Sequence, residues 1–251
     1  MEMHYFRTYS QVMGREMECK IYGSGGWPVL YIPCQDGRFY DFENLGMLDV
    51  WKPWLQSEQV MVCAIDTVDT ETWSNPHGDG RRKAECYENW LRYITDEVVP
   101  FLQDYANQKN KRNDPAGIMA FGCSLGATHA VNLYLRRPDL FNGLLALSGI
   151  YTAEYGFGWY MDDIVYQNSP IHFMKNFPKD HHYVEIYNRQ KAVICAGQGA
   201  WEIPDSTREL KSIFEEKGIH IWVDLWGYDV SHDWYWWYKQ VEYFLPYLLE
   251  K

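Results

Sequence analysis

One stretch, Gly117–Ala127, constrains the fold of this chain more than any other. It begins with the apolar run Ile118–Phe121, which is typical of a central parallel strand. It continues through Gly122-Cys123-Ser124-Leu125-Gly126 into a helical pattern that stops before Pro138. A serine at the apex of so tight a turn has a strained backbone, so its neighbours need to lack side chains. The pattern therefore predicts a strand, a sharp turn and a helix, with Ser124 raised above the sheet.

This unit matches the G-x-S-x-G pattern of a nucleophile elbow. At the apex, the hydroxyl of Ser124 is accessible to a base. The following N–H, that of Leu125, lies at a helix N-terminus, where it can face a developing oxyanion. The alternative is a glycine turn that packs a helix closely against a strand and has no chemical role. Residues elsewhere in the sequence are needed to distinguish these two interpretations.

Strands and helices alternate along most of the sequence. Residues 4–22 predict an antiparallel hairpin. Further strands are predicted at 27–33, 59–65, 143–149, 191–196 and 220–225, and helices at 47–56, 81–106, 127–137, 205–217 and 234–249, with Pro100 kinking or dividing the long one. We therefore expect a single α/β domain over residues 1–251, with a mostly parallel central sheet, an N-terminal hairpin and helices on both faces.

Two segments depart from this alternation. Residues 150–186 contain glycines, prolines and many aromatic side chains, and a segment of this length and irregularity is usually a lid or binding loop. We expect it to be an insertion of that kind. A shorter charged connection is expected over residues 109–114.

Composition excludes several classes of function. The net charge of -11 and the pI near 5.2 argue against nucleic acid and anionic membrane surfaces as partners. The N-terminus is charged and has no apolar run, so no signal peptide is expected and the cytoplasm is the expected location. Six scattered cysteines without CxxC spacing indicate free thiols and no structural zinc. The sequence leaves open whether the protein forms a homo-oligomer.

A serine nucleophile needs a histidine that takes its proton, and the histidine needs a carboxylate that orients it. On a parallel sheet these groups belong on loops at the carboxyl ends of the strands. Of the eight histidines, His232 is the one on a loop after the last predicted strand. The alternative for His232 is a surface residue that caps the helix behind it.

The loop after the 191–196 strand offers two carboxylates, Glu202 and Asp205. Asp205 is placed to be the N-cap of the following helix, which leaves Glu202 free to orient the histidine. We favour Glu202 and keep Asp205 as the alternative. A second oxyanion donor is expected from the loop after Pro33, where Gln35 or Asp36 can supply a backbone N–H.

These residues resemble the putative esterase family of α/β-hydrolases, which includes esterase D, feruloyl and acetyl-xylan esterases, enterochelin esterases and mycolyltransferases. The resemblance rests on Ser124 in Gly122–Gly126, the carboxylate in Gly197–Glu202 and His232 in Ser231–Trp234, and it spans most of the chain. It implies the α/β-hydrolase fold and a Ser-His-acid hydrolase that uses no cofactor and no metal. A glutamate as the acid also occurs in the mycolyltransferase branch.

The expected function is therefore that of a serine carboxylic-ester hydrolase. Ser124, His232 and Glu202 are expected to form an acyl-enzyme from an ester with a small or aromatic acyl group. Two other functions stay open at this point. One is an acyltransferase that passes the acyl group to an alcohol, and the other is a non-catalytic binding module on the same fold.

Overall fold

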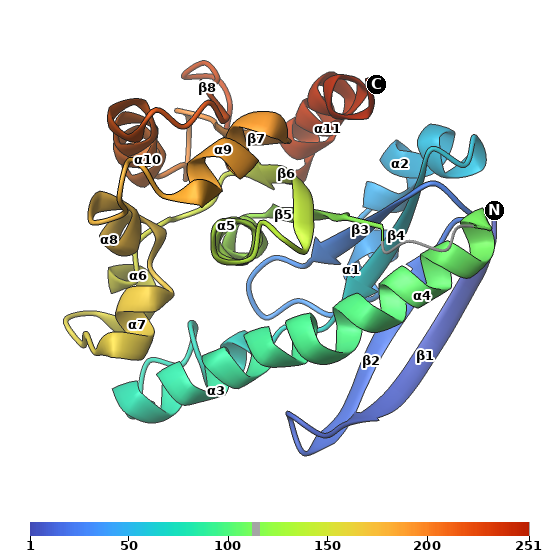
Figure 1. Ribbon diagram of the computed structural model, residues 1–251, viewed down its shortest axis with the longest axis horizontal. Helices are drawn as coiled ribbons and strands as arrows, with labels where there is room; N and C mark the ends of the chain where they lie inside the picture. Colours follow the sequence, from blue (N-terminus) through green and yellow to red (C-terminus); the bar gives the residue numbers. More distant parts are fainter. Residues whose placement is uncertain (112–115, 251) are drawn as a thin grey trace.

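An eight-stranded sheet runs through the computed structural model, which describes residues 1–111 and 116–250 (Figure 1). The strands are β1 (Met3–Ser10), β2 (Arg15–Tyr22), β3 (Trp27–Ile32), β4 (Val60–Ile65), β5 (Ile118–Cys123), β6 (Phe141–Leu147), β7 (Lys191–Ala196) and β8 (Trp222–Leu225). Their order in space is β1-β2-β4-β3-β5-β6-β7-β8. The β1–β2 and β2–β4 pairs are antiparallel and the other pairs are parallel, as the sequence predicted.

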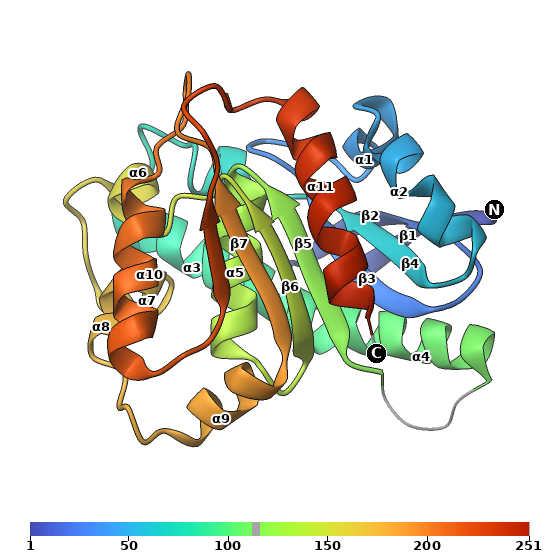
Figure 2. The ribbon, with the colours of Figure 1, turned by 90° about the horizontal axis from the view of Figure 1, so that it is seen from above.

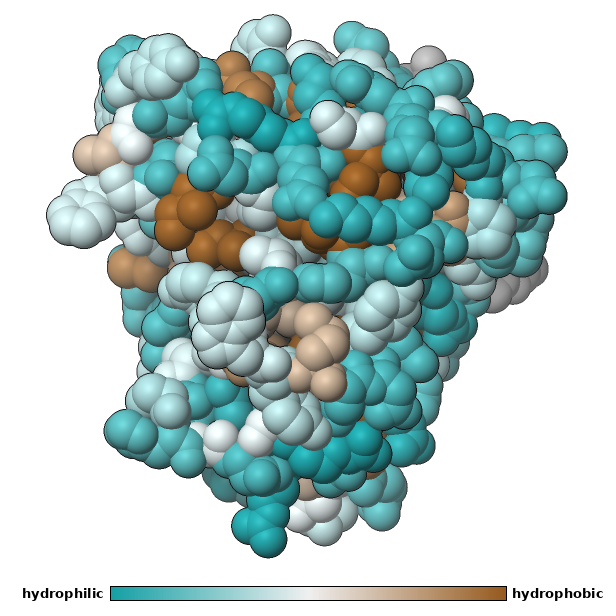
Figure 3. Space-filling view, turned by 90° about the vertical axis from the view of Figure 1, so that its left-hand side faces the viewer, coloured by the Kyte–Doolittle hydropathy of each residue, from teal (hydrophilic) through white to brown (hydrophobic). Residues whose placement is uncertain are grey.

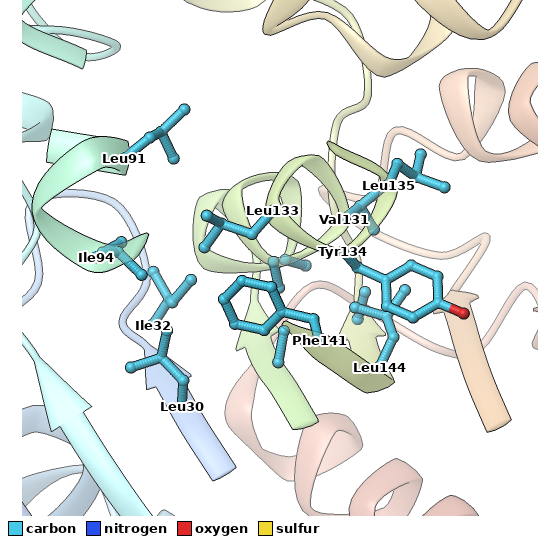
Figure 4. Close-up of a cluster of buried hydrophobic side chains, with 14 of the residues drawn as sticks. Leu30, Ile32, Leu91, Ile94, Val131, Leu133, Tyr134, Leu135, Phe141 and Leu144 are labelled. Atoms are coloured by element: carbon cyan, nitrogen blue, oxygen red, sulfur yellow. The ribbon is translucent and has the colours of Figure 1, made fainter. Parts of the chain in front are cut away.

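Helices cover both faces of the sheet because its strands are apolar on both sides. Along β3, Val29 and Tyr31 point into one buried cluster, whereas Leu30 and Ile32 point into the other. The first face is covered by α1 (Asp41–Asn44), α2 (Met47–Gln56) and α11 (Trp234–Leu249), and the second by α3 (Gly80–Tyr93), α4 (Val99–Asn110), α5 (Leu125–Arg136) and α10 (Asp205–Lys217). Figure 4 shows side chains of α3, α5, β3 and β6 meeting in the second cluster. Among the described residues, no helix has the length and apolar character needed to cross a membrane.

The long helix expected over 81–106 is divided, as Pro100 indicated. Helix α3 ends at Tyr93 and a π-helical turn, η2 (Ile94–Val98), joins it to α4. Pro100 lies in the first turn of α4, directly after this π-helical turn. Of the charged connection expected over 109–114, Lys109 and Asn110 belong to α4 instead, Lys111 follows as its cap, and residues 112–114 lie outside the described residues.

The segment 150–186 is more regular than its composition suggested. It contains α6 (Glu154–Phe157), α7 (Asp163–Gln167) and α8 (Pro170–Lys175), and α9 (His182–Arg189) begins near its end. Helices α6, α7 and α8 lie beside α10 on one side of the molecule, whereas α9 lies at the start of β7 (Figures 1 and 2). Asp162 caps α7 by accepting the N–H of Val165, and Pro170 opens α8.

The parallel strands β3 to β8 end at the same edge of the sheet, which is the upper edge in Figure 2. The connections after β3, β5, β7 and β8 contain predicted site residues, which are Gln35 and Asp36, Ser124, Glu202, and His232. The fold therefore gathers at one edge residues that are more than a hundred positions apart in sequence, such as Ser124 and His232.

The core around β5 supplies a test of this architecture. Phe121 is fully buried and packs against Tyr31 and Trp51, with ring centroids 5.3 and 4.9 Å away. We expect Phe121→Ala to lower the free energy of unfolding by about 3–5 kcal/mol, because it removes a ring from a core that cannot collapse around the gap. Urea denaturation followed by circular dichroism measures this. Tyr9→Ala is the control, because Tyr9 is exposed on the hairpin and its loss should cost about 0.5 kcal/mol or less.

Candidate active site

Ser124 stands at the apex of the turn between β5 and α5, with φ 55° and ψ -129°. This is a strained conformation for a residue with a side chain, and the surroundings hold it in place. A Cβ on Gly122 would lie 2.3 Å from the carbonyl oxygen of Gly126, and a Cβ on Gly126 would lie 2.2 Å from that of Ile32. Both glycines are therefore required sterically, as the motif predicted, and α5 is seated directly on the end of β3.

His232 lies on the connection between β8 and α11, and its Nε2 is 2.9 Å from the hydroxyl oxygen of Ser124. The backbone N–H of His232 donates to the carbonyl of Ala200 at 2.9 Å, and Gly199 N–H donates to Val230 at 2.8 Å. These bonds join the loop that contains His232 to the loop after β7. The imidazole also meets Trp237 edge to face, with ring centroids 5.0 Å apart.

Glu202, on the loop after β7, is the carboxylate next to His232. Its Oε2 is 3.4 Å from His232 Nδ1, and its side chain is only 2% exposed. Asp205 is 90% exposed and pairs with Arg208 instead. The expected N-cap role of Asp205 is wrong: Pro204 occupies the cap position and Asp205 is the first residue of α10. The reason for preferring Glu202 was therefore incorrect, although the structure brings Glu202 and His232 together.

Ser148, at the carboxyl end of β6, is a site residue that the sequence analysis missed. It is buried with φ 58°, donates its hydroxyl to Glu202 Oε1 at 2.6 Å, and accepts the indole N–H of Trp237 at 3.0 Å. Gly197 N–H also donates to Glu202 Oε1, at 3.2 Å. Glu202 is thus fixed by two donors besides the histidine. The available signal was the position of Ser148, near the carboxyl end of the strand predicted at 143–149 and so at the same edge.

The predicted oxyanion donors are the backbone N–H groups of Leu125 and of either Gln35 or Asp36. Leu125 is the first residue of α5, so its N–H has no acceptor within the helix. The N–H of Asp36 donates to the buried carboxylate of Asp69 at 3.2 Å, which argues against Asp36 as the second donor. Within residues 1–111 and 116–250, the N–H of Gln35 donates to no protein acceptor. Gln35 is therefore the better candidate of the two.

Two hollows adjoin these groups and share Tyr155. A small cavity of about 20 Å³ borders the nucleophile and is lined by Ser124, Leu125, Thr128, Ser148, Ile150 and Tyr155. A wider cleft of about 560 Å³ begins at Gln35 and is bounded by Trp73, Lys83, Phe157 and Tyr160. The hydroxyl of Tyr155 donates to the side chain of Gln35 at 3.1 Å. On the face that Figure 3 shows, apolar side chains are exposed in separate patches among polar ones.

The thiols and acidic groups around the site do not form a metal centre. Within the described ranges, no cluster of three or more His, Cys, Asp or Glu side chains could hold a metal ion. All six cysteines are free thiols. Burial raises the pKa of the Cys34 thiol to about 12 and that of Cys123 well above its usual value, so neither is a thiolate near neutral pH.

Comparison with known proteins gives a consistent result. Residues 10–246 match the model of the Esterase family, described as putative esterase. A curated relative, the diacylglycerol acyltransferase/mycolyltransferase Ag85A of Mycobacterium leprae (strain TN), is 24% identical over 150 residues. That match covers 59% of this chain and 44% of the relative, so the chain spans less than half of the relative's length.

Solved structures share the fold of this chain. A ferulic acid esterase matches with a TM-score of 0.74 and 15% identity, covering 99% of this chain and 97% of the other. FphF, a fluorophosphonate-binding serine hydrolase of Staphylococcus aureus, matches with a TM-score of 0.70 and 11% identity, covering 100% and 99%. These likenesses confirm the predicted α/β-hydrolase fold.

The bond from Ser148 to Glu202 supplies a second test. Ser148→Ala removes a donor to a buried carboxylate, and we expect kcat for p-nitrophenyl acetate to fall about tenfold, equivalent to about 1.4 kcal/mol. Steady-state kinetics measure this. Ser206→Ala is the matched control, because Ser206 is equally buried but accepts the N–H of Tyr151 instead. Equal kcat in the Ser148 and Ser206 variants would contradict the assigned role of Ser148.

Proposed function

This chain belongs to the putative esterase family, and from that membership we propose that it cleaves carboxylic esters with Ser124 as nucleophile, His232 as base and Glu202 as the acid. The observation that supports this most is the 2.9 Å contact between His232 Nε2 and the Ser124 hydroxyl. The two residues are 108 positions apart in sequence, so their contact results from the tertiary fold and not from local structure. A contact of this length is within reach for proton transfer.

In the proposed reaction, Ser124 Oγ attacks the ester carbonyl carbon while its proton passes to His232 Nε2. Glu202 accepts a hydrogen bond from the Nδ1–H of His232 and, remaining ionised, stabilises the imidazolium that forms. The contact of 3.4 Å between Glu202 and His232 is long, and such bonds commonly tighten when substrate binds. His232 then returns the proton to the leaving alcohol, and water hydrolyses the acyl-enzyme by the same sequence in reverse.

The negative charge of the tetrahedral intermediate develops on the former carbonyl oxygen. We assign its two donors to the backbone N–H groups of Leu125 and Gln35, since the N–H of Asp36 is already bonded to Asp69. Donors fixed before the reaction are effective because they need no reorganisation as the charge appears.

The hollows around Ser124 favour a small acyl group. A cavity of about 20 Å³ holds little more than one water-sized group, so formyl or acetyl fits beside Ser124 and a cinnamoyl-type group does not. The alcohol part of the ester then occupies the wider cleft that begins at Gln35. Of the small and aromatic acyl esters expected from the sequence, we therefore propose the small ones.

An acyltransferase is the second candidate, because the curated relative is named as one. Both activities share the acyl-enzyme, so the residues assigned above serve either. Turnover of p-nitrophenyl acetate with and without glycerol separates them: a transferase forms glyceryl acetate at the expense of acetate, and a hydrolase forms acetate in both cases.

The role of Ser124 is tested by its removal. Ser124→Ala is expected to lower kcat for p-nitrophenyl acetate on the order of 10⁴-fold or more, because the acyl-enzyme can no longer form. A fluorophosphonate probe should label the wild type and leave the variant unlabelled, which also tests the non-catalytic alternative. Ser57→Ala, an exposed serine after α2, is the control. Activity of Ser124→Ala within tenfold of wild type would end the proposal.

The size of the acyl cavity is tested with an ester series. Wild-type kcat/KM should fall from p-nitrophenyl acetate to the butyrate, because the added methylenes have no space. Ile150→Ala enlarges the cavity and should raise the ratio of butyrate to acetate kcat/KM about tenfold. Ile203→Ala makes the same change at an exposed position and should leave the ratio unchanged. An equal response in the two variants would refute this location for the acyl group.

A further inference from the structure

A buried pair of ionisable side chains lies beneath the candidate site and is not part of the proposed reaction. His129, on α5, is fully buried, and Asp69, in the turn η1 (Asp69–Glu71) after β4, is 1% exposed. His129 Nε2 lies 2.9 Å from Asp69 Oδ1. Burying two such groups is costly unless each hydrogen bond is satisfied, so the pair calls for an explanation.

The bonds around the pair run in one direction. Asn132 Nδ2 donates to the hydroxyl of Tyr87 at 3.4 Å, and that hydroxyl lies 2.8 Å from His129 Nδ1. An ionised Asp69 can only accept, so a neutral His129 carries its proton on Nε2, donates it to Asp69, and accepts the hydroxyl of Tyr87 at Nδ1. Rings of Trp73 and Trp90 enclose the imidazole, with centroids 5.8 and 5.1 Å away. The chain of donors ends on the Asp69 carboxylate.

The other oxygen of Asp69 reaches the loop after β3. Asp69 Oδ2 accepts the N–H of Asp36 at 3.2 Å, and Ser74 donates its hydroxyl to the Asp36 side chain. Asp36 has φ 58°, in the left-handed region that few residues other than glycine, asparagine and aspartate adopt. The loop is therefore fixed at Asp36, immediately after Gln35.

We propose that the His129–Asp69 pair positions the oxyanion hole. This rests on the proposed function, in which Leu125 and Gln35 are the two donors. Leu125 begins the helix that contains His129, and Gln35 precedes the residue that Asp69 holds. The pair thus connects the two donors through side chains and sets the distance between them. Asp69 and His129 are positioning residues and do not touch the substrate.

Asp69→Ala is the decisive variant. It leaves the N–H of Asp36 without its acceptor, so the loop can shift and the N–H of Gln35 no longer points at the oxyanion. We expect kcat for p-nitrophenyl acetate to fall 10²- to 10³-fold, as for the loss of one oxyanion donor, with KM within about threefold. Affinity for a boronic acid, which forms a tetrahedral adduct with the serine, should fall by a comparable factor.

A conservative variant separates positioning from charge. In Asp69→Asn, the amide oxygen can accept the N–H of Asp36, and the amide nitrogen can donate to His129 once the imidazole changes tautomer. This variant should recover kcat to within about tenfold of wild type. If Asp69→Ala fails to fold, the pair His129→Leu and His129→Gln replaces it, because glutamine can present a donor where Nε2 stood and leucine cannot.

Leu135→Ala controls for simple loss of stability. Leu135 lies in the last turn of the same helix, is fully buried, and has an apolar side chain that takes no part in these hydrogen bonds. It should lower the melting temperature as Asp69→Ala does while kcat stays within about threefold. A folded Asp69→Ala with wild-type kcat, or with kcat lowered but boronic acid affinity intact, would overturn the positioning role. Full activity of Ser124→Ala would instead overturn the proposed function.

Discussion

The seat of α5 on the end of β3 is the contact on which the rest of the site depends. Because Gly126 has no side chain, its backbone approaches the carbonyls of Ile32 and Pro33 more closely than any other residue could. This contact fixes the turn that raises Ser124, and it sets the nucleophile beside the loop that follows β3. Backbone packing alone thus brings the end of β3, the start of α5 and the loop after β3 to one place.

Around that contact, hydrogen bonds join the loops that contain the other candidate site residues to one another in pairs. The loops after β7 and β8 are joined through the backbone of His232 and Ala200, so the loop of the candidate base is held to the loop of the candidate acid. The loop after β3 is joined to the turn after β4 through Asp36 and Asp69. Each proposed catalytic group is therefore held by a neighbouring connection as well as by its own strand.

Much of this arrangement could be predicted because it depends on local patterns. Glycine spacing identified the turn at Ser124, and apolar runs located the strands whose ends surround it. Chain order selected His232 and limited the acid to Glu202 or Asp205. The remaining features depend on contacts between distant segments. Ser148 and His129 lie within apolar elements and look like ordinary core positions, and the bond that removes Asp36 from consideration comes from Asp69, a residue with no local signature. Asp205 has the sequence of a cap, but the backbone begins the helix one residue earlier.

The joined loops that contain Glu202 and His232 have a consequence for heat inactivation. They rest on β7 and on β8, a short edge strand with a neighbour on one side, whereas Ser124 is anchored between the central strands. Partial opening of the molecule from that edge would separate the base from the nucleophile while the centre of the sheet stays folded. The temperature at which activity is lost is thus set by the stability of the β7–β8 edge of the sheet. The well-packed centre of the sheet does not set it.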